Sequence, residues 1–296
     1  MGIPDAMQDW KLKHDELLES CGFVPPGHYY SPVPALADIR RDEARIFGPW
    51  PRTIAGIDMR EAEQLELLES FVPFYKTMPF QHEPSAGLRY HFNNPSYAYS
   101  DAVMLHCMLR KLHPQRLIEI GSGFSSCVSL DTNERFFEGR MQTTFIEPYP
   151  DLLRSLIRPE DRQRTTIIEK RLQDVELSLF DTLQAGDVLF VDSTHVSKID
   201  SDVNSIFFEI LPRLARGVHV HFHDIFYPFE YPKEWIYSGR AWTEMYMLRT
   251  FLQFNSAYRI VLMNTFMEGF HEAFFAEKMP LCLVNRGGSI WLERAG

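Results

Sequence analysis

The sequence predicts an α/β protein with a doubly wound, seven-stranded sheet and an N-terminal appendage. Two observations lead to this prediction. From about residue 97 onward, short apolar runs alternate with amphipathic stretches, which is the pattern of parallel strands connected by helices. One of these runs, at residues 117–120, leads directly into Gly121-Ser122-Gly123, a turn suited to joining a strand to a helix. Residues 1–95 lack the alternation, so we predict an appendage over 1–95 and one domain over 96–296.

The elements follow in a regular order. The predicted strands cover residues 117–120, 143–147, 165–168, 187–192, 217–223, 258–263 and 289–292. The predicted helices cover residues 59–74, 100–110, 151–157, 202–214 and 242–254, with Ser100 or Asp101 capping the second of them. Parallel strands joined by helices have right-handed connections, so these elements predict a sheet with helices on both faces.

The composition narrows the classes of function. The chain has 296 residues, of which 45% are hydrophobic and 24% are charged, as in an ordinary globular protein. Its formal net charge of −10 argues against binding to nucleic-acid backbones. No apolar run has membrane-spanning length, and the polar N-terminus does not resemble a signal peptide. We therefore expect no membrane partner. The cysteines are scattered without C-x-x-C spacing, so we expect reduced thiols and a cytoplasmic location. The sequence leaves open whether the protein forms a homo-oligomer.

The glycine turn is the first candidate site. Gly121 and Gly123 let the backbone approach a ligand, and Ser125 or Ser126 can cap the following helix. Glu119, two residues before the first glycine, would repel the pyrophosphate of a dinucleotide. The same acid suits a cationic ligand group, such as the amino group of a methionine moiety.

The pattern Glu119-x-Gly121-x-Gly123 resembles motif I of the class I S-adenosylmethionine-dependent methyltransferases, which have a Rossmann-like sheet. Glu147 ends the next strand, where an acid can accept both ribose hydroxyls. The resemblance implies that S-adenosylmethionine is bound by these residues: Glu119, Gly121, Ser122, Gly123, Phe124, Glu147, Gln173, Asp174 and Tyr99.

A second group of polar residues follows the fourth and fifth strands. Asp192 and Asp224 close these strands, with His195 and His223 beside them. Asp192, Asp224 and His223 could hold a divalent cation such as Mg²⁺, or the acids could orient a histidine as general base without a metal. His219 and His221 lie deeper in the strand, where we expect buried structural histidines.

The second group resembles a branch of the same family that includes catechol-type and sugar O-methyltransferases with a bound metal. That resemblance implies His195, His223 and Asp192 as catalytic residues and Asp192, Asp224 and His223 as metal ligands. Catechol-type enzymes have Asp-Asn where this chain has His223-Asp224, which leaves metal dependence open.

The sequence therefore predicts an O-methyltransferase that acts on a small-molecule acceptor, either a sugar or a secondary metabolite. We expect residues 1–95 and the aromatic loop 224–235 to cover the acceptor. Two alternatives stay open. One is a metal-dependent oxygenase-like or hydrolytic enzyme on the same fold, and the other is a non-catalytic cofactor-binding subunit.

Overall fold

The computed structural model describes residues 23–296, which form two compact units. The smaller unit comprises the chain up to Trp50 together with Pro232–Ala241, and the larger comprises Pro51–Tyr231 and Trp242–Gly296. The predicted boundary at residue 95 stays a prediction, and residues 51–95 belong to the larger unit. Cys21 lies outside the described residues, whereas Cys107, Cys127 and Cys282 are buried free thiols.

The part of the smaller unit that the structure describes contains three short helices. They are α2 (Leu36–Arg41), α3 (Glu43–Ile46) and α9 (Lys233–Tyr237). Glu43 joins the two segments of this unit, because its carboxylate pairs with Lys233 and accepts a hydrogen bond of 2.7 Å from the Tyr237 hydroxyl.

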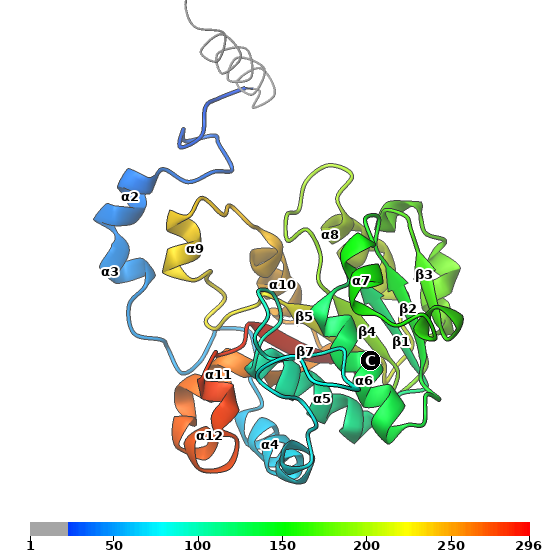
Figure 1. Ribbon diagram of the computed structural model, residues 1–296. Helices are drawn as coiled ribbons and strands as arrows, with labels where there is room; N and C mark the ends of the chain where they lie inside the picture. Colours follow the sequence, from blue (N-terminus) through cyan, green and yellow to red (C-terminus); the bar gives the residue numbers. More distant parts are fainter. Residues whose placement is uncertain (1–22) are drawn as a thin grey trace, which may run out of the picture. The chain divides into compact units, whose positions relative to one another are not determined.

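The larger unit is built on one seven-stranded sheet (Figure 1). The strands are β1 (Arg116–Ile120), β2 (Gln142–Ile146), β3 (Thr165–Ile168), β4 (Val188–Val191), β5 (His219–His223), β6 (Tyr258–Met263) and β7 (Ser289–Arg294). Their order in the sheet is β3-β2-β1-β4-β5-β7-β6, with β7 antiparallel to both of its neighbours. The predicted seven-stranded, doubly wound sheet is therefore confirmed.

Helices cover both faces of this sheet, because right-handed connections place them on opposite sides where the strand order reverses between β1 and β4. The helices are α4 (Glu61–Lys76), α5 (Ser100–Leu112), α6 (Phe124–Phe136), α7 (Asp151–Leu156), α8 (Asp202–Ser205), α10 (Glu244–Leu252), α11 (Asn264–Phe270) and α12 (Glu272–Lys278). Short 3₁₀ turns occur at Asp161–Gln163, Leu172–Asp174, Leu177–Thr182 and Pro280–Leu283. Such a reversal opens a crevice at the carboxyl ends of the strands, where open α/β sheets bind ligands.

Several helical segments differ from the sequence prediction, which did not include α2, α3, α9 or α12. The segment expected as one helix over 202–214 continues after α8 as a π-helical turn, Ile206–Ile210, and a 3₁₀ turn, Leu211–Arg213. Pro212 lacks the N–H that a continuing α-helix needs. The sequence analysis did not predict α11, which is buried along most of its length and so lacks an amphipathic pattern.

A buried ion cluster holds the segment before α5 against α6. The side chain of Arg89 is 4% exposed and pairs with Asp131 of α6 at 2.7 Å and with Glu134 of α6 at 2.6 Å. Its Nε also donates to Asp161 at 2.7 Å. A buried guanidinium is tolerated only with such partners. Part of the predicted appendage is thus anchored to the helix that follows the glycine turn.

Candidate active site

The turn between β1 and α6 requires glycine at one of its two glycine positions. Gly121 has φ +77°, and a Cβ there would lie 2.0 Å from the carbonyl oxygen of Asp192. Gly123 is extended at φ 177°, and a Cβ there would meet only Leu152 Cδ2 at 3.4 Å. Gly121 therefore lets β1 and β4 approach closely at the crevice, whereas Gly123 leaves space beside the helix start.

Glu119 is fully buried beneath this turn. The hydroxyls of Ser125 and Ser126 donate to its Oε1 at 2.6 and 2.8 Å, while its Oε2 is buried without a partner. Burial raises the pKa of Glu119 to about 8, although both serine hydrogen bonds favour the carboxylate. An unpaired buried acceptor fits a ligand that brings a hydrogen-bond donor.

The two serines do not precede the helix as predicted. The helix begins at Phe124, so Ser125 and Ser126 lie in its first turn, where Ser126 Oγ accepts from the N–H of Gly123 at 3.1 Å. Both serine hydroxyls are thus used by hydrogen bonds to Glu119.

A cavity of about 380 Å³ lies at the carboxyl ends of β1, β2 and β4. Glu147 lines it and accepts hydrogen bonds from the N–H groups of Ser122 at 3.3 Å and Tyr149 at 2.8 Å. The other predicted residues on its wall are Gly121, Gln173 and Asp192. The cavity fits a ligand with hydroxyl groups, because the half-buried Glu147 carboxylate is held in place by backbone donors.

The other predicted cofactor residues lie away from the lining of this cavity. Asp174 is exposed and pairs with Arg171 at 2.9 Å. Tyr99 stacks on Phe92 with ring centroids 4.9 Å apart, and its hydroxyl lies 2.7 Å from His82 Nδ1. Glu119, Ser122, Gly123 and Phe124 surround the turn without lining the cavity. Their contact with cofactor stays a prediction.

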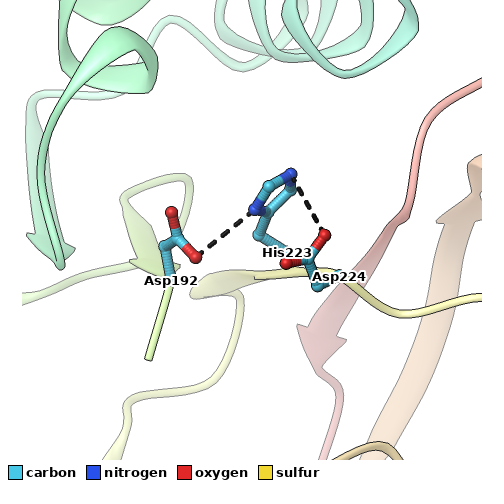
Figure 2. A group of neighbouring side chains, drawn as sticks. All are labelled: Asp192, His223 and Asp224. Atoms are coloured by element: carbon cyan, nitrogen blue, oxygen red, sulfur yellow. Dashed lines mark hydrogen bonds and ion pairs between the residues drawn. The ribbon is translucent and has the colours of Figure 1, made fainter. Parts of the chain in front are cut away.

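The second predicted group comes together at the ends of β4 and β5. One ligand atom each of Asp192, His223 and Asp224 lies within 4.8 Å of the others. His223 lies between the two carboxylates, with Nδ1 3.3 Å from Asp192 Oδ1 and Nε2 3.7 Å from Asp224 Oδ1 (Figure 2). His195 Nε2 lies 3.3 Å from Asp192 Oδ1 and 3.5 Å from Asp224 Oδ2. Residues that the sequence places in two separate motifs thus form one cluster.

Two residues of this cluster have a left-handed backbone conformation, which glycine adopts more readily than other residues. His195 has φ +60° and Asp224 has φ +58°. Left-handed backbone costs a side-chain-bearing residue about 1–2 kcal/mol, and such conformations gather at functional sites. The carbonyl of His195 is fixed by the N–H groups of Thr243 at 2.9 Å and Glu244 at 3.1 Å.

The sequence analysis missed two carboxylates of the cluster. Asp101 was expected as a helix cap, but α5 begins at Ser100 and the buried Asp101 carboxylate accepts from Ser289 Oγ at 2.8 Å and the Gly288 N–H at 3.2 Å. His223 Nε2 lies 3.7 Å from it. Glu244, the first residue of α10, lies 2.9 Å from His195 Nδ1. Neither residue follows a strand of the parallel sheet, so no strand-end pattern indicated them.

The cluster has more carboxylates than cationic rings. Burial disfavours the charged ring of His195, yet Asp192 and Glu244 raise the pKa of His195 to about 10. The pKa of His223 is likewise raised well above its usual value, against the effect of burial, by Asp224, Asp192 and Asp101. Burial raises the pKa of Asp224, and the two histidines oppose this shift. With Asp101, Asp192, Asp224 and Glu244 against two rings, the site favours a further positive charge.

Of the remaining histidines of β5, His221 is buried as expected, whereas His219 is half-buried. His221 is fully buried and stacks on Phe190 with ring centroids 4.1 Å apart. Burial lowers the pKa of His221 to about 3, so its ring is neutral. His219 lies at the other end of the strand, 4.0 Å from Glu293.

The aromatic loop after Asp224 is packed into the protein over most of its described length. Tyr227, Phe229 and Tyr231 are each 1% exposed. Tyr227 also donates its backbone N–H to Thr265 Oγ1 at 2.7 Å. Packing accounts for these rings, and a covering role of the loop stays a prediction.

Comparisons with known proteins agree with the fold and the turn. A family described as a methyltransferase domain matches residues 118–225. An uncharacterized protein of Archaeoglobus fulgidus is 36% identical over 164 residues, which cover 54% of this chain and 73% of the relative.

Solved structures also resemble this chain. The O-methyltransferase TomG from Streptomyces achromogenes, in complex with SAM, is 16% identical with a TM-score of 0.44, covering 78% of this chain and 90% of TomG. The SAH-bound methyltransferase PaMTH1 of Podospora anserina is 12% identical with a TM-score of 0.43, covering 93% of this chain and 100% of PaMTH1. The family match, the relative, the sheet order and the glycine turn together assign this chain to the class I S-adenosylmethionine-dependent methyltransferases.

Proposed function

We propose that this methyltransferase transfers a methyl group to a hydroxyl of a small molecule, with a divalent cation held by Asp192, His223 and Asp224. The observation that carries this proposal is the place of Asp192. Asp192 lines the cavity that contains Glu147, and it also belongs to the cluster of three ligand atoms within 4.8 Å. A methyl donor in the cavity and a hydroxyl at the cluster would therefore be neighbours.

The cavity residues suit the cofactor of the family. Glu147 would accept the ribose hydroxyls, and Gln173 on the same wall would reach the adenine edge. The unpaired Oε2 of Glu119 would accept from the amino group of the methionine moiety. S-adenosylmethionine supplies, when bound, a methyl group on a positively charged sulfur, and the carboxylate of Asp192 places negative charge beside it.

The cluster residues suit a hard divalent cation such as Mg²⁺, which prefers carboxylate oxygens and keeps several waters. Such a cation would supply Lewis acidity that favours deprotonation of a hydroxyl beside it. The ring of His195 faces Asp192 and Asp224 through Nε2, and these acids together with Glu244 favour its charged form. A cation held by Asp192 and Asp224 would offset their charge and favour the neutral ring, whose Nε2 could then take the proton that the hydroxyl releases. Holding the hydroxyl oxygen in line with the methyl group would provide most of the acceleration.

The alternatives expected from the sequence are weaker for this chain. Membership of the methyltransferases removes the basis for an oxygenase or a hydrolase on the same fold. The cluster of buried, strained and charged side chains beside the cavity favours an enzyme over a cofactor-binding subunit. A general base without metal is the remaining alternative for the chemistry.

A transfer assay tests this proposal. The purified protein is incubated with S-adenosylmethionine labelled in the methyl group and with a fractionated metabolite extract, with and without EDTA and with Mg²⁺ or Mn²⁺ restored. We expect label in one small-molecule fraction, stable to base as an ether is, lost with EDTA and restored by the metal. Asp192→Asn should abolish the label, whereas the control Asp151→Asn, an exposed acid of α7, should keep it. Label that survives EDTA would contradict the metal, and label in protein would contradict the acceptor class.

A further inference from the structure

The pair formed by Glu244 and His195 has no role in the family motifs described above. Both oxygens of the Glu244 carboxylate are engaged. Oε2 lies 2.9 Å from His195 Nδ1, and Oε1 accepts from the hydroxyl of Ser193 at 2.8 Å. The same Ser193 oxygen accepts the backbone N–H of His195 at 2.9 Å. Glu244, Ser193 and His195 thus form a closed ring of hydrogen bonds.

The backbone joins the same two segments a second time. The N–H groups of Thr243 and Glu244, where α10 begins, both donate to the carbonyl of His195. Thr243 Oγ1 in turn accepts the N–H of Ser197 at 2.8 Å. The ring of Trp242 packs against the imidazole with centroids 4.3 Å apart. The start of α10 and the loop after β4 are therefore fixed to each other through backbone and side chains.

This arrangement determines which nitrogen of His195 faces the site. An ionised carboxylate can only accept hydrogen bonds, so Nδ1 of His195 must carry a hydrogen directed at Glu244. Nε2 is then the nitrogen that faces Asp192 and Asp224. Glu244 is 1% exposed and does not line the cavity, so it reaches the site through its two partners, His195 and the cavity residue Ser193.

We propose that Glu244 is the positioning residue of the transfer site, which holds His195 with Nδ1–H bound and Nε2 presented to the acceptor hydroxyl. This inference rests on the proposed function of His195. It explains how the left-handed backbone of His195 persists, because a strained residue is maintained only where its surroundings over-determine it. It also assigns a function to the start of α10, which the sequence motifs do not include.

The test is a pair of substitutions with a readout that does not need the acceptor. Glu244→Ala removes the carboxylate, and Glu244→Gln keeps an oxygen that can accept from Nδ1–H. Glu230→Gln is the matched control, because Glu230 accepts from Tyr246 of the same helix and has no contact with His195. Proton NMR of protein with ¹⁵N-labelled histidine, with S-adenosylhomocysteine and Mg²⁺ added, then follows the Nδ1–H resonance that His195→Gln removes.

We expect a downfield, slowly exchanging Nδ1–H resonance in wild type, Glu244→Gln and Glu230→Gln, and its loss in Glu244→Ala. Transfer of label into the metabolite extract should fall roughly 10–100-fold in Glu244→Ala and recover in part in Glu244→Gln, with affinity for S-adenosylhomocysteine unchanged. A resonance retained in Glu244→Ala, or unchanged transfer by that variant, would overturn the positioning role. If His195→Gln transfers label normally, the proposed function fails at His195, while the resonance still decides whether Glu244 holds the ring.

Discussion

The two halves of the crevice are built in different ways. On the β1–β2 side, the turn, the buried acid beneath it and the strand-end acid Glu147 come from one continuous stretch of chain. On the β4–β5 side, the cluster takes side chains from α5, the loop after β4, the end of β5 and the start of α10. Asp192 belongs to both halves.

This difference separates two kinds of constraint. The first half is governed by local sterics, because Gly121 must let β1 approach the Asp192 carbonyl. The second half is governed by charge, because buried carboxylates and rings need one another as partners. Substitutions in the glycine turn should therefore affect folding, whereas substitutions in the cluster should affect chemistry.

The largest effect is expected at Gly121. Gly121→Ala places a Cβ 2.0 Å from a backbone oxygen at φ +77°, so the free energy of unfolding should fall by more than about 4 kcal/mol, or the protein should fail to fold. Gly123→Ala, at φ 177° with its nearest atom at 3.4 Å, should cost about 1 kcal/mol or less. Urea denaturation measures both. Equal losses for the two alanines would contradict the steric account of the turn.

The second effect lies in the chemistry. His195→Ala should lower methyl transfer roughly 10²–10⁴-fold, because it removes the group that takes the hydroxyl proton. Affinity for S-adenosylhomocysteine, measured by calorimetry, should stay the same since His195 does not line the cavity. The exposed His113→Ala is the control. If transfer persists in His195→Ala but stops with EDTA, the cation alone activates the hydroxyl.

A third prediction concerns the anchor of the segment before α5. Arg89→Met leaves Asp131 and Asp161 without their buried partner, which should cost about 3–5 kcal/mol of unfolding free energy. Arg154→Met removes an exposed pair with Glu169 and should cost at most about 1 kcal/mol. Similar losses in thermal or urea unfolding would show that the Arg89 cluster contributes no more than a surface pair.

The pH dependence of stability tests the buried acid Glu119. Its folded pKa of about 8 lies above the ordinary value of 4.5, so its contribution to stability is fully present below about pH 4.5 and is lost as pH rises through 8. Because of Glu119, the free energy of unfolding of the wild type should fall by roughly 2–3 kcal/mol between pH 6 and pH 8, at 1.36 kcal/mol per pKa unit. Glu119→Gln should remove this fall. Urea unfolding at both pH values measures it, and parallel pH curves for wild type and variant would disprove the shift.

The sequence could predict the strands and the turn because each depends on local pattern. Apolar runs identified all seven strands, and Glu147 and Asp192 were predicted from their positions at strand ends, whereas Gln173 was predicted from the family resemblance. Asp101 and Glu244 could not be predicted, because nothing near them in the chain marks them as partners of histidines far away in sequence. Asp174 and Tyr99 were predicted from the family resemblance. In this structure Asp174 pairs with Arg171, and Tyr99 stacks on Phe92.

The most direct test of the account is to separate the two halves by binding alone. Calorimetry with S-adenosylhomocysteine and electron paramagnetic resonance with Mn²⁺ are applied to wild type, Glu147→Ala and Asp224→Asn. The account predicts that wild type binds both S-adenosylhomocysteine and Mn²⁺. Glu147→Ala should weaken the binding of S-adenosylhomocysteine by about 1–3 kcal/mol and still bind Mn²⁺. Asp224→Asn should lose Mn²⁺ binding and still bind S-adenosylhomocysteine. Wild type that binds no Mn²⁺, or an Asp224→Asn variant that loses the nucleoside as severely as Glu147→Ala, would contradict it.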